Sequence, residues 1–68
     1  MSRYRELAAH TEKLIADGLL RPGERLPSVR SACRSHGVSP ITVTQAYYLL
    51  ESRGLIEARP KSGYFVRA

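Results

Sequence analysis

The sequence is short of the features that mark secreted and membrane-spanning proteins. It contains one cysteine, Cys33, so no disulfide can form within the chain, which fits a reducing compartment. No segment approaches the roughly 20 apolar residues that a membrane span requires, and the N-terminus does not resemble a signal peptide. These absences predict a cytoplasmic protein that does not contact a membrane.

Features of enzymes are also missing. The chain has no glycine-rich phosphate loop followed by lysine, no cluster of metal ligands and no pair of nucleophile and base. Its two histidines, His10 and His36, lie 26 residues apart without cysteine or acidic partners at ligand spacing. A single domain of 68 residues also leaves little room for a substrate pocket. We therefore predict no enzymatic activity, no metal site and no cofactor in this domain.

What the chain does have is an uneven distribution of positive charge. The formal net charge is +5 and the pI is near 10.0. Residues 1–24 hold four basic and four acidic groups, whereas residues 25–68 hold seven basic and two acidic groups. The whole excess lies in the second part. It indicates either an ordinary basic domain or a surface that binds a polyanion.

Three segments have the pattern of helices. Residues 3–18 place apolar or small side chains at intervals of three and four, and the following LLRPG predicts a turn. Residues 28–37 predict a short helix with a serine cap at its start and a glycine at its end. The Ser39-Pro40 pair then predicts the start of a third helix, which reaches about Arg53. Two helices joined by so short a connection form a helix-turn-helix.

The pattern after Gly54 changes to that of strands. LIEAR and YFVR are rich in strand-forming residues, and Pro60 to Gly63 separate them. This predicts a two-stranded hairpin with a basic tip. Three helices followed by a hairpin make a winged helix-turn-helix, a mainly α fold with a small β-hairpin, and we expect one such domain over residues 1–68.

The third predicted helix has an outer face without charge. Val43, Ala46, Tyr47 and Leu50 share its inner face, and the first three turns carry no charged residue at all. A solvated face usually carries Glu, Lys and Arg, so an uncharged face usually contacts a partner. Hydroxyls, amides and methyls are the groups that read base edges in the DNA major groove. They are supplied here by Ile41, Thr42, Thr44, Gln45 and Tyr48.

This face also offers more specific DNA contacts, and two other interpretations of it stay open. Gln45 can make a bidentate contact, which would favour adenine, and the hydroxyls of Ser39 and Thr42 suit a phosphate at the helix N-terminus. The threonines can equally be ordinary solvated residues. Ile41 and Tyr48 can instead cover the hairpin or a protein partner.

Several motifs in fixed order resemble a known family. PGERLPSVR, GVSPITV and LLESRGLIEARPKSGYFV are similar to the N-terminal DNA-binding domain of GntR-family bacterial transcription regulators, over about Tyr4 to Val66. Within that family, AYYLLESRGLIEARPKSGYFV resembles the MocR branch. The resemblance implies a longer protein, in which a linker joins this domain to an absent aminotransferase-like domain that binds pyridoxal phosphate.

The resemblance also implies residue roles. Arg30 matches the family arginine that contacts DNA at the groove, and Ser39 and Thr42 match the polar positions that open the recognition helix. Gly63 matches the wing-tip glycine that enters the adjacent minor groove, with Lys61 beside it. The residues predicted to contact double-stranded DNA are Arg30, Ser39, Pro40, Ile41, Thr42, Thr44, Gln45, Tyr48, Arg59, Lys61, Ser62 and Gly63.

Two departures from the family pattern remove charge from the recognition helix. The family usually has arginine where this chain has Pro40, and often has arginine again at Thr44. We therefore expect the isolated domain to bind DNA weakly and with little sequence preference. No exposed heptad seam or long apolar patch is visible in the sequence, so we expect the isolated domain to be a monomer. Strong operator binding would need two copies on two half-sites, as in a homodimer of the full-length protein.

Two other functions remain open at this point. The uncharged helix face would also suit a winged helix that docks onto a protein partner, although the basic hairpin argues against it. A structured-RNA binder would share the charge pattern but prefer A-form duplexes.

Overall fold

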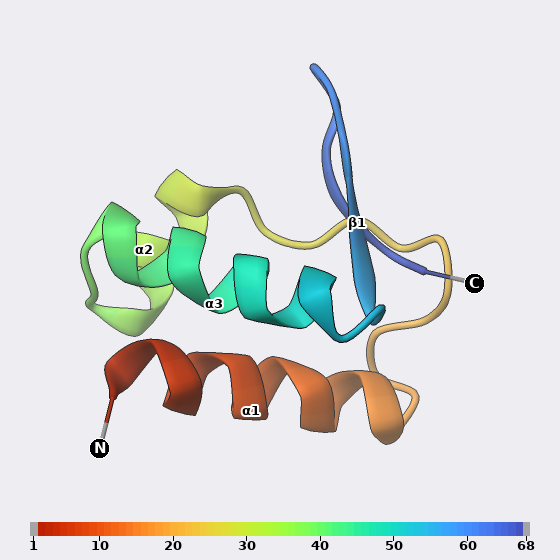
Figure 1. Ribbon diagram of the computed structural model, residues 1–68, viewed down its shortest axis with the longest axis horizontal. Coiled ribbons are helices and arrows are strands. Elements are labelled where there is room, and N and C mark those ends of the chain that lie inside the picture. Colours follow the sequence, from red (N-terminus) through yellow and green to blue (C-terminus); the bar gives the residue numbers. More distant parts are fainter. Residues whose placement is uncertain (1, 68) are drawn as a thin grey trace.

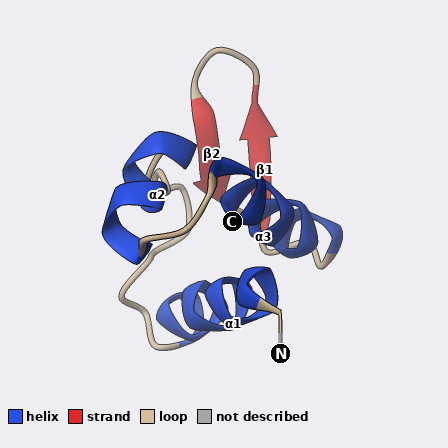
Figure 2. Ribbon diagram, turned by 90° about the vertical axis from the view of Figure 1, so that its left-hand side faces the viewer, coloured by secondary structure: helices blue, strands red, loops and turns tan. Residues whose placement is uncertain are grey.

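The computed structural model describes residues 2–67 and has the expected winged helix-turn-helix architecture (Figure 1). Helices α1 (Arg3–Ala16), α2 (Val29–His36) and α3 (Pro40–Ser52) are followed by strands β1 (Ile56–Arg59) and β2 (Gly63–Val66). The hairpin projects away from α1, which lies on the opposite side of α3 in both views (Figures 1 and 2). None of the helices in the described residues is long and apolar enough to cross a membrane.

Helix α1 packs along α3 through one face. Leu7, Ala8 and Thr11 are buried on it, and the Thr11 hydroxyl donates a hydrogen bond of 3.0 Å to the Leu7 carbonyl, so burial leaves no polar group unpaired. The helix ends at Ala16, two residues before the predicted end at Gly18. The difference is the final turn, where Asp17 caps the helix and Gly18 takes a positive φ of 80°.

The capping residues of α2 and α3 confirm the predicted starts of both helices. Ser28 accepts a hydrogen bond from the Ser31 amide, and Ser39 accepts one from the Thr42 amide. Pro40 occupies the first turn of α3, where its missing N–H costs nothing. At the end of α2, Gly37 adopts a left-handed conformation with φ of 64°, as a glycine cap does.

The hairpin pairs with one more segment that the sequence did not reveal. Strands β1 and β2 are antiparallel, with Ile56 opposite Val66 and Arg59 opposite Gly63. On the other edge of β2, Arg25 forms an isolated antiparallel bridge with Phe65. The stretch before α2 therefore pairs as a short third strand, whereas the sequence pattern predicted only a turn at Pro22 and Gly23.

The core lies where the three helices and the base of the hairpin meet. Tyr47 is 2% exposed, its ring packs edge-to-face on Tyr64 at 4.8 Å, and its hydroxyl donates to the Pro27 carbonyl at 2.7 Å. Cys33 is half-buried and packs against this core, as expected of a small apolar residue. The buried apolar residues are Leu7, Ala8, Leu26, Ala32, Val43, Ala46, Tyr47, Leu50, Ile56 and Val66.

Candidate nucleic-acid interface

The outer face of α3 is open to solvent, as the sequence predicts. Val43, Ala46 and Leu50 are fully buried on the inner face, whereas Ile41 and Tyr48 are 71% and 73% exposed on the outer one. Within the described residues, neither Ile41 nor Tyr48 covers the hairpin, so that alternative is wrong. Two large apolar side chains are left without a partner on a face with no charge.

Hydroxyl groups gather at the first turn of α3. The Ser39 and Thr42 hydroxyls lie 3.0 Å apart and share a hydrogen bond, beside the free amides of the helix N-terminus. The Thr44 hydroxyl donates to the Pro40 carbonyl at 2.9 Å, one turn back. Its hydrogen is therefore engaged by the helix itself, although Thr44 as a residue is exposed. Gln45 is exposed beside them and carries the amide of this face.

Arg30 and the hairpin lie on one side of the molecule. Arg30 is the second residue of α2 and is exposed. The start of α2 and the tip of the hairpin both lie on the side of α3 that faces away from α1 (Figure 1). The start of α2, which carries Arg30, and the hairpin tip thus lie on the same side of the molecule.

The tip of the hairpin is a tight turn with a lysine in a strained conformation. The Ser62 amide donates to the Arg59 carbonyl at 3.0 Å, Pro60 holds the second position, and Lys61 has a φ of 66°. These are the features of a type II turn, whose third position favours glycine. A lysine there costs about 1–2 kcal/mol. The turn thus keeps a positive charge at an exposed position despite that cost.

Arg59 lies back along the hairpin instead of pointing from its tip. Its guanidinium pairs with Glu57 at 3.3 Å and lies over the Phe65 ring, 4.3 Å from the centroid. The Glu57 carboxylate offsets part of the charge that the sequence assigns to DNA contact. Of the predicted wing residues, Lys61 and Ser62 are exposed in the turn, and Gly63 is half-buried at the start of β2.

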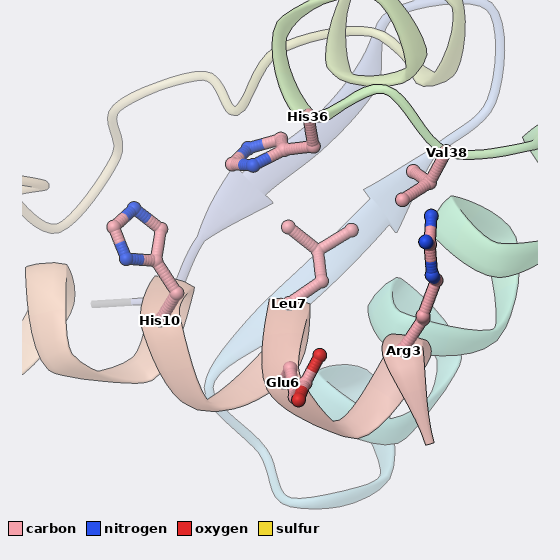
Figure 3. Close-up of a pocket in the computed structure, with 6 residues that line it drawn as sticks. All are labelled: Arg3, Glu6, Leu7, His10, His36 and Val38. Atoms are coloured by element: carbon pink, nitrogen blue, oxygen red, sulfur yellow. The ribbon is translucent and has the colours of Figure 1, made fainter. Parts of the chain in front are cut away.

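The structure also brings together two histidines that are distant in the sequence. His10 of α1 and His36 at the end of α2 face each other edge-on, with ring centroids 5.7 Å apart. They line an open pocket with Leu7, and Glu6 points away from both rings (Figure 3). Among residues 2–67, no three His, Cys, Asp or Glu side chains are grouped to hold a metal ion. This pocket contains none of the predicted DNA-contact residues.

Comparison with known proteins identifies the family. The model of "Bacterial regulatory proteins, gntR family" matches residues 3–66, nearly the whole chain. The chain belongs to the GntR family. It is a GntR-family DNA-binding domain.

Individual members of the GntR family are similar over the full domain. HTH-type transcriptional regulator YjiR of Escherichia coli (strain K12) is 54% identical over 66 residues, and YdcR of the same strain is 50% identical. These matches cover 97% of this chain but 14% of each relative, so the chain spans about a seventh of their length.

Solved structures in complex with DNA share the fold. The DNA-binding domain of AraR in complex with operator ORX1 has a TM-score of 0.94 at 26% identity, covering 97% of this chain and 80% of that one. The winged fold of this chain is therefore also the fold of a domain that was solved in complex with an operator.

Proposed function

We propose that this domain docks on double-stranded DNA with α3 in the major groove and the hairpin tip at the adjacent minor groove. Ile41, Thr44 and Gln45 meet base edges, and the Ser39–Thr42 hydroxyl pair meets a phosphate at the N-terminus of α3. Arg30 and Lys61 contact the backbone on either side. The major groove, about 12 Å wide, admits an α-helix.

The observation that carries this proposal is the exposed face of α3, uncharged in its first three turns, together with basic residues at the start of α2 and at the hairpin tip. Ile41 and Tyr48 are more than two-thirds exposed there. Arg30 opens α2, and Lys61 stands at the tip of the hairpin. The AraR domain of the same fold, solved in complex with an operator, supports DNA as the ligand.

Affinity in this arrangement comes mainly from phosphate contacts. Four to six basic groups meeting phosphates would give a slope of about −4 to −5 for log affinity against log salt. Discrimination between sequences should be modest, because a good bidentate pair is worth about 1–3 kcal/mol and Gln45 is the one candidate. Two copies on two half-sites would supply the rest.

A chemical-shift titration of the labelled domain with a random-sequence duplex tests the docking directly. At low salt, the shifts should concentrate at Arg30, residues 39–45 and residues 61–63, and they should shrink at moderate salt. Shifts confined to α1, or affinity that does not change with salt, would contradict the proposal.

Three charge variants separate binding from folding. Arg30→Gln and Lys61→Gly should each lower the magnitude of the salt slope by about one. Lys61→Gly also removes the strain of a left-handed lysine, so its stability should stay the same or rise by up to about 1 kcal/mol. Lys13→Gln removes an exposed charge from α1 and serves as the matched control. A loss of affinity in Lys13→Gln equal to that in Lys61→Gly would overturn the assignment.

A second candidate function is docking onto a protein partner, which the exposed apolar side chains of Ile41 and Tyr48 favour. The same titration distinguishes the two, because a protein-docking domain should show no shifts on α3 with DNA at low salt. Competition by duplex RNA, if it were stronger than by DNA, would favour RNA as the ligand.

For the whole protein, we propose a homodimeric regulator of the MocR branch that acts in the cytoplasm, where bacterial DNA lies. The motif AYYLLESRGLIEARPKSGYFV supports the branch, and the share of YjiR that the chain spans supports a longer protein. Pyridoxal phosphate would belong to the additional domain. Light scattering of the full-length protein should give a dimer, and the isolated domain should give a monomer. Full-length protein that fails to retain pyridoxal phosphate on dialysis would contradict the branch assignment.

A further inference from the structure

The short strand before α2 places an arginine on the wing. The Leu26 amide donates to the Tyr64 carbonyl at 2.8 Å, and the Val66 amide donates to the Glu24 carbonyl at 2.9 Å. These two bonds fix Arg25 opposite Phe65, on the outer edge of β2. Because diagonal neighbours on a sheet lie within reach of long side chains, Arg25 can extend toward the tip.

The Arg25 guanidinium covers Gly63. A Cβ atom on Gly63 would lie 3.2 Å from the Arg25 Nε and 3.5 Å from its Nη2. Gly63 also has a φ of 114°, a backbone conformation that residues other than glycine rarely adopt. The absence of a side chain at Gly63 therefore leaves the space that this guanidinium occupies.

The charge of Arg25 remains available for a ligand, whereas the charge of Arg59, across the hairpin, is paired with Glu57. Within residues 2–67, the ion pairs join Arg53 to Glu12 and Arg59 to Glu57. Arg25 takes part in neither and is exposed. The wing thus carries two unneutralised cations close to its tip, Lys61 in the turn and Arg25 beside Gly63.

We infer that Arg25 is a DNA-contact residue, which binds a backbone phosphate where the wing meets the minor groove. Gly63 acts as its positioning residue. The inference rests on the proposed docking of the wing, where the family resemblance implies Gly63 and Lys61 alone at the minor groove. The guanidinium presents a flat set of donors that match a phosphate.

Filter binding of a duplex at several salt concentrations tests this. Arg25→Gln removes the charge, and the loss of one phosphate contact should weaken binding about eightfold at 0.1 M salt and lower the slope by about one. Arg25→Lys should restore most of the slope, which a purely structural role would not. Arg21→Gln makes the same charge change in the same connection, away from the hairpin tip, and should bind as the wild type does.

The outcomes separate this inference from the proposed function. If the wild type binds DNA and Arg25→Gln binds with the same affinity and slope, the inference is wrong and the docking stands. If the wild type binds no duplex at low salt, both are wrong. Melting curves of the Arg25 variants check that they remain folded, which the exposure of Arg25 leads us to expect.

A double-mutant cycle tests the positioning role of Gly63. Gly63→Ala should weaken DNA binding when Arg25 is present, because the new methyl group displaces the guanidinium. The same change should have little further effect in the Arg25→Gln background. Equal losses in both backgrounds would show that Gly63 acts on DNA independently of Arg25.

Discussion

Tyr47 is the residue whose removal should most clearly test how α3 holds the start of α2. Its hydroxyl donates a hydrogen bond of 2.7 Å to the carbonyl of Pro27, the residue before the Ser28 cap. Tyr47→Phe keeps the ring and its edge-to-face packing on Tyr64 and removes the hydroxyl alone. The loss measured is therefore that of one hydrogen bond.

The expected loss of folding free energy depends on whether the Pro27 carbonyl finds another hydrogen-bond donor in the variant. A neutral hydrogen bond contributes about 0.5–1.5 kcal/mol net, and a carbonyl left without its partner can raise the cost to about 3 kcal/mol. Pro27 is exposed as a residue but this hydrogen bond is part-buried, so the middle of that range applies. We expect about 1–2 kcal/mol, which in a domain of this size lowers the Tm by about 4–16 °C.

High pH provides a second, independent readout. Burial, with smaller contributions from Tyr64 and Cys33, raises the pKa of Tyr47 from 10.0 to about 12. The folded state therefore holds this proton more tightly than the unfolded state does. The free energy of unfolding that this pKa difference contributes is fully present below pH 10. It is lost as the pH rises toward 12, by about 3 kcal/mol in total. Tyr47→Phe should lack this part of the decline.

Thermal and urea unfolding followed by circular dichroism measure both effects. Tyr48→Phe is the matched control, since Tyr48 is the adjacent tyrosine and is 73% exposed. It should unfold as the wild type does at neutral pH. A Tyr47→Phe protein as stable as the wild type, with the same decline above pH 10, would refute the reasoning.

Other variants test the helix cap, the core and the surface. Ser39→Ala should destabilise the domain by about 1 kcal/mol, because it removes the acceptor for the Thr42 amide, and weaker DNA binding should accompany this in a titration. Leu50→Ala, at a fully buried position, should cost about 2–5 kcal/mol and leave the domain largely unfolded by circular dichroism. Arg53→Ala breaks a 2.8 Å ion pair with Glu12 that is about half exposed, so urea unfolding should change by less than about 1 kcal/mol. A larger change would mean that the pair fixes α1 against α3.

Local signals predicted most of the fold. Ser28 and Ser39 each cap the helix that they were expected to start, and Gly37 ends α2 as expected. The helical spacing of apolar residues correctly predicted that Val43 and Leu50 lie on the buried face of α3. Each of these signals depends on residues within one or two turns of one another, so the sequence contains the whole cause.

The candidate site was predictable as a set of residues but not as an arrangement. The exposed face of α3 follows from helical spacing, whereas the position of Arg59 over Phe65 follows from the strand register. Arg25 had no pattern around it that would distinguish it from other surface arginines. Its position depends on pairing with Phe65, 40 residues later in the chain.

The sequence by itself determined the order of the elements, the helix caps, the inner and outer faces of α3, and the excess of positive charge after residue 24. Only the tertiary structure decided which charges stand together. In the folded chain the Glu57 carboxylate lies beside the Arg59 guanidinium, the Arg25 guanidinium lies beside Gly63, and His10 lies beside His36. The physical reason is range: propensity and capping act between near neighbours in the chain, whereas pairing of distant strands and helices is fixed by burial of a shared core.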